Sequence, residues 1–484
     1  MRKVKFVIVL SVFFLSMFSL HSGLGVNAVT SSPTADTLSV IFPHSQDFAD
    51  WVFQDFKGWY KNQTGNDITV QSVPLDSTAA EEQVATWNGT SPESDIIWGG
   101  GAYNFELLRN NPGLNLLEPY QVAEHANYTS SFGDWDLYEP QTGTPSWYAA
   151  AISGFGFMWN TEYLTAHDLA PPTTWADLTN YSYFGHIVMC DPSASGSTTA
   201  TVNQILQYMS TAHGTSAVTT SANMTEAWQY WAKVAGNVGQ WTTSSSQVPT
   251  KVANGDFGIG IVIDYYSWEQ SEAGKPVAFS YGGATTASPD PVAIIHNAPH
   301  LAQAKYFMDY ITSTQGQSRV GKYRTPANFQ ATTPADGPVK RAFKSDGTAD
   351  TSGFPIITPY NSTIDGLVFN RARALFSKWF VVNTDKQTAA WKAINKASGD
   401  KKTKALAEYT KLPTGFDGTI GGLLSLDYHT ASVTDGWAND GATNFDAAKS
   451  EAGGSGGIPG FNFYFVFLAV IPLIAIKKKY SKKN

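Results

Sequence analysis

The sequence contains very little cysteine: Cys190 stands alone among 484 residues. No intramolecular disulfide can form, and no cysteine follows the amino-terminal apolar segment to carry a lipid anchor. Positive charge is also scarce, because 32 Lys and Arg face 40 Asp and Glu, which gives a net charge of -8. This balance argues against nucleic-acid binding, which requires a basic surface.

Common enzyme motifs are missing as well. The chain has no G-x-S-x-G elbow at a strand–helix turn, no H-E-x-x-H zinc motif and no phosphate-binding G-x-x-x-x-G-K-[ST] loop. With 40 acidic residues, a carboxylate pair for glycoside hydrolysis stays open, so a secreted hydrolase is one alternative. We expect a protein that is not an enzyme.

The chain begins with the pattern of an export signal. A basic start precedes an apolar stretch at 6–20 and a small-residue exit at 26–28. That layout is typical of a cleaved secretory signal peptide, so we expect residues 1–28 to be removed and the remainder to be exported.

A second apolar segment, 459–476, lies near the other end. As a helix it would reach about 27 Å, enough to cross most of a bilayer core. The lysine-rich residues 477–484 follow it, and basic residues beside a span stay cytoplasmic. We therefore expect an extracytoplasmic domain at the cell surface, anchored to the cell membrane by a C-terminal transmembrane helix. A buried core helix is the alternative interpretation of this segment.

Acceptor sites for N-linked glycans agree with export. The motif Asn-x-Ser/Thr arises by chance in so threonine-rich a chain, yet its frequency here predicts a glycoprotein. The six acceptor residues are Asn62, Asn88, Asn127, Asn180, Asn223 and Asn361.

Strand and helix patterns alternate along the exported part. Residues 37–42 and 68–73 have the composition of strands, and between them apolar residues recur at threes and fours over 48–60. A β-α-β beginning predicts an α/β fold with a largely parallel sheet and helices on its faces.

Candidate site residues lie where such strands end. In open α/β sheets, ligands bind beyond the carboxyl ends of the strands, where helix N-termini present N–H donors. His44 follows the first strand, and Gly99, Gly100 and Gly101 follow another at 94–98. We expect these four residues to face a ligand. A surface or hydrogen-bonded role is the alternative for His44.

The alternation of predicted strands and helices divides the chain into two lobes. An apolar segment at 147–159 marks a crossing into a second lobe, and a strand at 291–295 crosses back. No internal repeat is apparent, which disfavours a surface-anchored structural or adhesive protein, the other alternative. The expected organisation is a discontinuous lobe one at 36–148 and 291–412 with a helical C-terminal part packed on it, lobe two at 149–290, and a loop-rich tether at 413–458.

The stretch GIGIVIDYYSW, residues 258–268, begins as a buried strand and ends with Asp264, Tyr265 and Tyr266. Consecutive strand residues point to opposite faces, so both tyrosine rings can reach one ligand only if the strand ends there. Ordinary strand aromatics are the alternative, because tyrosine has a high β propensity.

Four stretches together resemble a known family. They are SDIIWGGG (94–101), PPTTWADLTNYSYFGHIVMCDPSASGS (171–197), TKVANGDFGIGIVIDYYSW (250–268) and DPVAIIHNAPHLAQAKYFMDYITSTQGQ (290–317). The chain resembles the extracellular solute-binding proteins of ABC importers, particularly the ferric-iron-type group. The resemblance implies a two-lobed periplasmic-binding-protein-like fold of type 2. It also implies capture of a small solute in the interlobe cleft and delivery to ABC permease and ATPase subunits, without a resident cofactor.

The resemblance bears on the two tyrosines. In ferric-binding relatives adjacent tyrosines supply phenolate ligands and a histidine supplies another; here Tyr265, Tyr266 and His44 occupy the matching places. Fe(III) is a hard cation that favours anionic oxygen. The acidic ligand of such proteins, however, is replaced here by Trp98 and the glycines 99–101.

That replacement favours a neighbouring branch of the superfamily, whose members bind phosphorylated or other organic anions. The loop DPSASGS (191–197) precedes a helix, where free N–H groups, hydroxyls and the helix dipole suit an anion. Simple N-capping by these serines is the alternative. On the anion interpretation the glycines 99–101 and the tyrosines also contact the ligand. The further candidates are Ser193, Ser195, Gly196, Ser197, Ser245 and Asp264.

Overall fold

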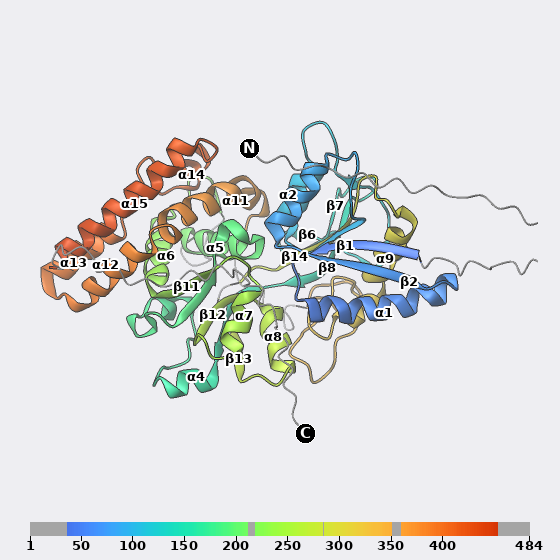
Figure 1. The fold of residues 1–484 in the computed structure, drawn as a ribbon, viewed down its shortest axis with the longest axis horizontal. Coiled ribbons are helices and arrows are strands. Elements are labelled where there is room, and N and C mark those ends of the chain that lie inside the picture. Colours follow the sequence, from blue (N-terminus) through green and yellow to red (C-terminus); the bar gives the residue numbers. More distant parts are fainter. Residues whose placement is uncertain (1–35, 212–217, 284, 351–359, 454–484) are drawn as a thin grey trace, which may run out of the picture.

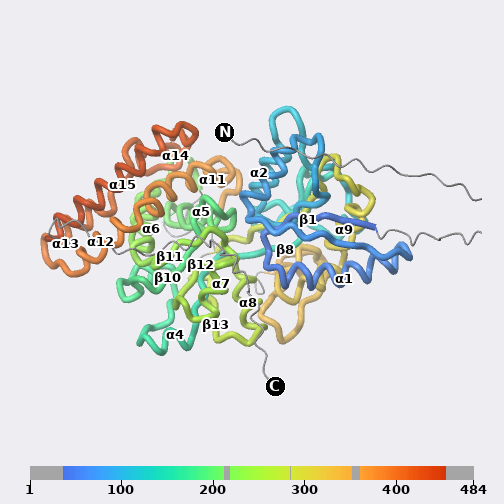
Figure 2. The backbone as a smooth tube through the Cα atoms, in the orientation of Figure 1, coloured from blue at the N-terminus to red at the C-terminus, as the bar shows by residue number. Residues whose placement is uncertain are grey.

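The computed structural model describes residues 36–211, 218–283, 285–350 and 360–453, which form two α/β lobes and a helical C-terminal region (Figures 1 and 2). The predicted signal peptide at 1–28, the predicted span at 459–476 and the lysine tail lie outside the described residues. Within the described part, no helix is both long and apolar enough to cross a membrane.

Lobe one is built around a mixed sheet. Its strand order is β2-β1-β3-β14-β8-β7, with β4 also paired to β14. Strand β1 runs parallel to β2 and β3, whereas β14 runs antiparallel to β3 and β8. The strands are β1 (Asp36–Phe42), β2 (Ile68–Pro74), β3 (Ile96–Trp98), β4 (Leu117–Glu118), β7 (Tyr138–Glu139), β8 (Trp147–Ser153) and β14 (Ser288–Ile295).

Alternation along β1 explains why helices cover both faces of this sheet. Leu38 and Val40 point to one face, where they pack with α1 and α9, whereas Ile41 points to the other, where it packs with α2 and α3. Helix α1 ends where Gly65 takes a left-handed φ of 79°. The helices are α1 (Gln46–Thr64), α2 (Ser77–Trp87), α3 (Ala102–Arg109), α9 (Leu301–Thr312) and α10 (Thr314–Val320), and smaller elements are β5 (Ser131–Phe132), β6 (Trp135–Asp136) and the 3₁₀ turn His125–Asn127.

Lobe two has a second sheet, of strand order β11-β10-β12-β9-β13. Its strands are β9 (Phe155–Asn160), β10 (Ile187–Cys190), β11 (Val238–Thr242), β12 (Ile259–Ile263) and β13 (Val277–Ser280). Its helices are α4 (Thr161–Ala166), α5 (Gly196–Ser210), α6 (Thr225–Asn237), α7 (Gln247–Ala253) and α8 (Asp264–Glu272), with 3₁₀ turns at Trp175–Thr179, Tyr181–Tyr183 and Pro192–Ala194.

The chain crosses between the lobes at the ends of two long strands. Strand β8 belongs to the sheet of lobe one and β9 to that of lobe two, so Gly154 between them is a crossing point. Strand β14 carries the chain back and pairs with β8. The predicted lobe boundaries at 149 and 290 fall inside these two lobe-one strands.

The helical C-terminal region packs on lobe two, which corrects the prediction that it packs on lobe one. Trp379 and Phe380 lie against Trp228 of α6, in the same core as the lobe-two strands. The C-terminal helices lie beside α6 (Figure 1), and Trp228 and Trp231 of α6 are buried in the core that they share. The elements are α11 (Ser362–Phe376), a π-helical turn (Ser377–Val381), α12 (Thr384–Lys396), α13 (Gly399–Tyr409), α14 (Ile420–Ser425) and α15 (Ala431–Glu451).

The predicted loop-rich tether at 413–458 is also corrected. Most of its described part is helical, as α14 and the 21-residue α15. Trp437, Phe445 and Ala448 are buried from α15 against the neighbouring helices. Its apolar residues are few and widely spaced among small ones, so the helical period was too weak to recognise in the sequence.

Candidate ligand-binding cleft

A narrow cleft lies between the lobes, where three helices begin. Helix α3 approaches it from lobe one, and α5 and α8 approach it from lobe two. The room for the centre of a water-sized molecule is only about 30 Å³, and the two lobes touch beside it; we call this arrangement closed. Of the predicted site residues, those lining the cleft are Gly100, Gly101, Gly196, Ser197, Ser245, Tyr265 and Tyr266, and those set back from it are His44, Gly99, Ser193, Ser195 and Asp264.

The loop before α5 is organised by its own caps. Ser195 is the N-cap, because its Oγ accepts a hydrogen bond from the Thr198 N–H at 3.2 Å and also bonds to the Ser197 Oγ at 3.1 Å. Ser193 is exposed, and its N–H donates to the Asp191 carboxylate. Capping therefore accounts for Ser195, while Gly196 and Ser197 reach the cleft.

The glycine loop between β3 and α3 has a conformation that requires glycine. Gly99, Gly100 and Gly101 have φ angles of 91°, 113° and 89°, where a Cβ is strained. A Cβ on Gly99 would also lie 2.3 Å from the His44 ring. The Gly100 N–H donates to the Asp290 Oδ1 at 3.1 Å, so an oxygen atom already occupies one donor of this loop.

The two lobes touch directly beside these loops. The Gly196 N–H of lobe two donates to the Ser77 Oγ of lobe one at 2.8 Å. A Cβ on Gly196 would lie only 2.5 Å from the Gly100 carbonyl oxygen. Ser77 was not predicted, because nothing in its sequence neighbourhood shows that it meets a residue 119 positions away.

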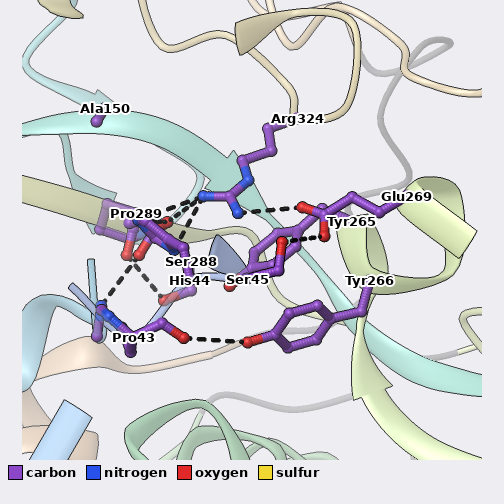
Figure 3. A network of polar contacts seen from close by, with 12 residues as sticks. Pro43, His44, Ser45, Ala150, Tyr265, Tyr266, Glu269, Ser288, Pro289 and Arg324 are labelled. Atoms are coloured by element: carbon purple, nitrogen blue, oxygen red, sulfur yellow. Dashed lines mark hydrogen bonds and ion pairs between the residues drawn. The ribbon is translucent and has the colours of Figure 1, made fainter. Parts of the chain in front are cut away.

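The two tyrosines belong to a helix. Strand β12 ends at Ile263 and α8 begins at Asp264, so Tyr265 and Tyr266 occupy the first turn of α8, with ring centroids 4.7 Å apart. The Tyr266 hydroxyl donates to the Pro43 carbonyl oxygen of lobe one at 3.4 Å (Figure 3). Burial raises the pKa of Tyr265 well above 10 and that of Tyr266 to about 12. Both phenols are therefore neutral hydrogen-bond donors at neutral pH.

Asp264 holds the crossing between the lobes. Its Oδ2 accepts hydrogen bonds from the Gly154 N–H at 2.8 Å and the Tyr281 hydroxyl at 2.9 Å, and its Oδ1 accepts from the Tyr265 N–H at 2.7 Å. Burial raises the pKa of this carboxyl to about 7, although these three donors oppose the shift. Asp264 thus ties the β8–β9 crossing to the beginning of α8.

A buried arginine, which sequence reasoning missed, organises the base of the cleft (Figure 3). Arg324 is 1% exposed, and its guanidinium lies 3.3 Å from both the Glu269 and the Asp290 carboxylates. Its guanidinium carbon lies 3.6 Å from the Phe48 ring centroid and 3.9 Å from that of Tyr265. Because Glu269 comes from α8 and Arg324 from lobe one, this ion pair joins the lobes.

His44 belongs to the arginine network. Its Nδ1 lies 3.1 Å from the Arg324 Nη1, and its ring is buried against Trp98. Burial and the nearby guanidinium lower the pKa of His44 well below 6.5, so the ring is neutral. In the part of the chain that the structure describes, no group of three or more His, Cys, Asp or Glu side chains could hold a metal ion.

Comparisons with known proteins agree with this architecture. The phosphoglycerate transport regulatory protein PgtC of Salmonella typhimurium is 30% identical over 289 residues, which cover 60% of this chain and 64% of the relative, less than two thirds of its length. Among solved structures, the fructose-6-phosphate-bound periplasmic binding protein AfuA of Actinobacillus pleuropneumoniae is similar at a TM-score of 0.51 and 20% identity, covering 62% of this chain and 88% of that chain. The periplasmic binding protein P5PA is similar at a TM-score of 0.53 and 20% identity, covering 72% of this chain and 99% of that chain.

These structural likenesses show the two-lobed fold, as the sequence predicted. A family model described as bacterial extracellular solute-binding protein matches residues 95–350, more than half of the chain. That family consists of binding proteins and not of enzymes. The chain belongs to the bacterial extracellular solute-binding proteins.

Proposed function

We propose that this protein captures a small organic anion, such as a phosphorylated metabolite, in the interlobe cleft and delivers it to the permease and ATPase of an ABC importer. On this proposal residues 1–28 are a cleaved signal and residues 459–476 anchor the binding domain at the cell surface. The observation that carries the proposal is the meeting of two loop–helix junctions, Gly100–Gly101 before α3 and Gly196–Ser197 at the beginning of α5, across one cleft.

Two N–H donors of these junctions already bind oxygen atoms in the closed structure. The Gly196 N–H binds the Ser77 hydroxyl, and the Gly100 N–H binds the Asp290 carboxylate. When the lobes separate, the first of these contacts breaks, and an N–H at a helix N-terminus becomes available to a ligand oxygen. The Ser197 and Ser245 hydroxyls lie in the same lining and add donors.

The charge of the cleft limits how an anion would bind. None of the described lining residues is Lys, Arg or His, and Asp290 and Asp365 are among them. An anion would thus be held by neutral N–H and O–H dipoles, and the two carboxyl groups would pair with protonated ligand oxygens. Burial raises the pKa of both carboxyl groups, that of Asp365 to about 6, which favours such proton sharing.

The relatives support this ligand class. PgtC is named for phosphoglycerate transport, and AfuA was solved with fructose-6-phosphate. Ferric iron is less well supported, because His44 faces Arg324 and a guanidinium lies on the Tyr265 ring. The positive charge of the Arg324 guanidinium would repel a trivalent iron ion bound beside it.

Calorimetry with the purified full-length protein tests the proposal, using 3-phosphoglycerate and fructose 6-phosphate as ligands. Ser197→Ala should weaken binding by about 0.5–3 kcal/mol, the range for a lost hydrogen bond to a neutral or charged group. Ser193→Ala is the matched control, since Ser193 is exposed and outside the lining, and it should leave the affinity unchanged.

Ferric citrate provides the opposing test. Phenolate-to-iron complexes are coloured, so a visible band that Tyr266→Phe diminishes would assign the tyrosines to metal. That result, together with no binding of either phosphate ester, would contradict the anion proposal.

A further inference from the structure

A second and larger cavity opens beside the cleft. It offers about 570 Å³ to the centres of water-sized molecules, whereas the cleft offers about 30 Å³. Ala102, Tyr103, Trp135 and Asp365 line both spaces, so the two lie side by side. We name this cavity the side chamber. Lobe one forms one wall through α2, α3 and the strands β6 to β8, and the beginning of α11 forms the other.

The side chamber is strongly acidic. Its lining contains no Lys, Arg or His among the described residues, and Tyr103, Trp135 and Trp147 supply aromatic surface. Its carboxyl groups are Glu81, Glu106, Asp136, Glu139 and Asp365. The side chamber is therefore unsuited to a second acidic group of a ligand.

Only part of this negative charge is balanced by the surrounding protein. The Arg109 guanidinium, which is outside the lining, pairs with Glu106 and lies 3.7 Å from Glu139. Glu81 has no hydrogen bond or ion pair within the described residues, and Arg373 and Glu82 act on it only at longer range. Burial raises the pKa of Glu81, and burial with the neighbouring carboxyl groups raises that of Glu139 to about 7. A cation bound in the side chamber would stabilise the ionised form of both carboxyl groups.

We propose that the side chamber is a second compartment of the ligand site and takes an organic cation, an alkylammonium group carried by the molecule whose anionic end binds in the cleft. The anionic end rests on the proposed function above. Charge complementarity selects a cation, and aromatic faces beside carboxylates stabilise an alkylammonium group in particular. The shared lining residues place the two spaces side by side, within reach of one molecule that spans the cleft and the side chamber.

The wall formed by α11 lies outside the part of the chain that matches the family model. Ser362, Thr363, Gly366 and Leu367 line the side chamber, and all four lie beyond residues 95–350, which match the family. The C-terminal helices therefore do more than cover lobe two. The beginning of α11 completes a binding space beside the cleft, and it thereby helps to determine which ligand tail fits.

Calorimetry with the purified full-length protein and a matched ligand pair tests the proposal. Phosphocholine and 3,3-dimethylbutyl phosphate have nearly the same shape and the same anionic end, but only the first carries a positive nitrogen. We expect phosphocholine to bind at least tenfold more tightly. Glu81→Gln should reduce this ratio severalfold with little effect on inorganic phosphate. Glu82→Gln removes the same charge from the exposed next residue of α2 and should leave the ratio unchanged.

The outcomes separate this proposal from the proposed function. Equal binding of the two esters would overturn the cation compartment and leave anion capture intact. Binding of choline that Glu81→Gln weakens, without binding of inorganic phosphate or 3,3-dimethylbutyl phosphate, would support the side chamber and contradict anion capture. A ratio that Glu81→Gln and Glu82→Gln lower equally would assign the preference to general surface charge and overturn the proposal.

Discussion

Replacing Gly196 by alanine should prevent the lobes from closing. Gly196 is the first residue of α5 and lies where lobe two contacts Gly100 and Ser77 of lobe one. A Cβ there would lie 2.5 Å from the Gly100 carbonyl oxygen, whereas ordinary contact begins at 3.4 Å. The difference, 0.9 Å, is the distance by which backbone must separate from backbone, since no flexible side-chain end can move aside. The Gly196 N–H to Ser77 hydrogen bond, now 2.8 Å, would stretch beyond bonding distance.

The Gly196→Ala substitution should destabilise the closed arrangement of the lobes and not the folded state. A ligand held between the two junctions would lose contact with one of them, and each hydrogen bond lost removes about 0.5–1.5 kcal/mol from the closed complex. Gly196 has no positive φ, and alanine is favoured over glycine in a helix by up to about 1 kcal/mol. We therefore expect at least about a tenfold loss of affinity for 3-phosphoglycerate at an unchanged or slightly higher melting temperature.

Small-angle scattering and calorimetry check this expectation together. The variant should keep a larger radius of gyration at saturating ligand than the parent protein. Gly58→Ala in α1 is the matched control, because a Cβ there meets nothing within 4 Å. A Gly196→Ala protein that binds with parental affinity and reaches the same compact radius would refute the closed-state geometry.

Three further predictions concern buried groups. Arg324→Met should lower the free energy of unfolding by about 3–5 kcal/mol, because Glu269 and Asp290 lose their cation, and urea titration would contradict this if the midpoint were unchanged. Burial raises the pKa of Asp365 from 3.8 to about 6, so the folded state binds more protons and stability should fall as pH rises through that window. Asp365→Asn should flatten this part of the urea-midpoint profile, and an equally steep profile would exclude Asp365 as its source. Trp379→Ala should lower the free energy of unfolding by about 3–5 kcal/mol, and lobe two and the C-terminal helices should still unfold in one calorimetric transition because they share a core. Separate transitions would contradict the shared core.

Local patterns in the sequence determined the fold class and much of the cleft. Strand and helix periods are set by neighbours within a few residues, so the α/β alternation and the two-lobed architecture were predicted correctly. Helix beginnings are equally local. Glycines 99–101 and the loop 191–197 were predicted to lie at such places, and Gly100, Gly101, Gly196 and Ser197 do line one cleft.

Tertiary structure alone decided which distant groups meet. Ser77, Asp290 and Arg324 come from three separate segments, and no spacing in the chain shows that they converge on the cleft. The apolar face of a helix likewise shows that the helix is packed against something, but it does not identify the partner. The sequence therefore assigned the C-terminal helices to the wrong lobe. The side chamber follows from that packing, because its wall exists only once α11 lies against lobe two. Local periodicity encodes the elements, whereas long-range complementarity of shape and charge decides their neighbours.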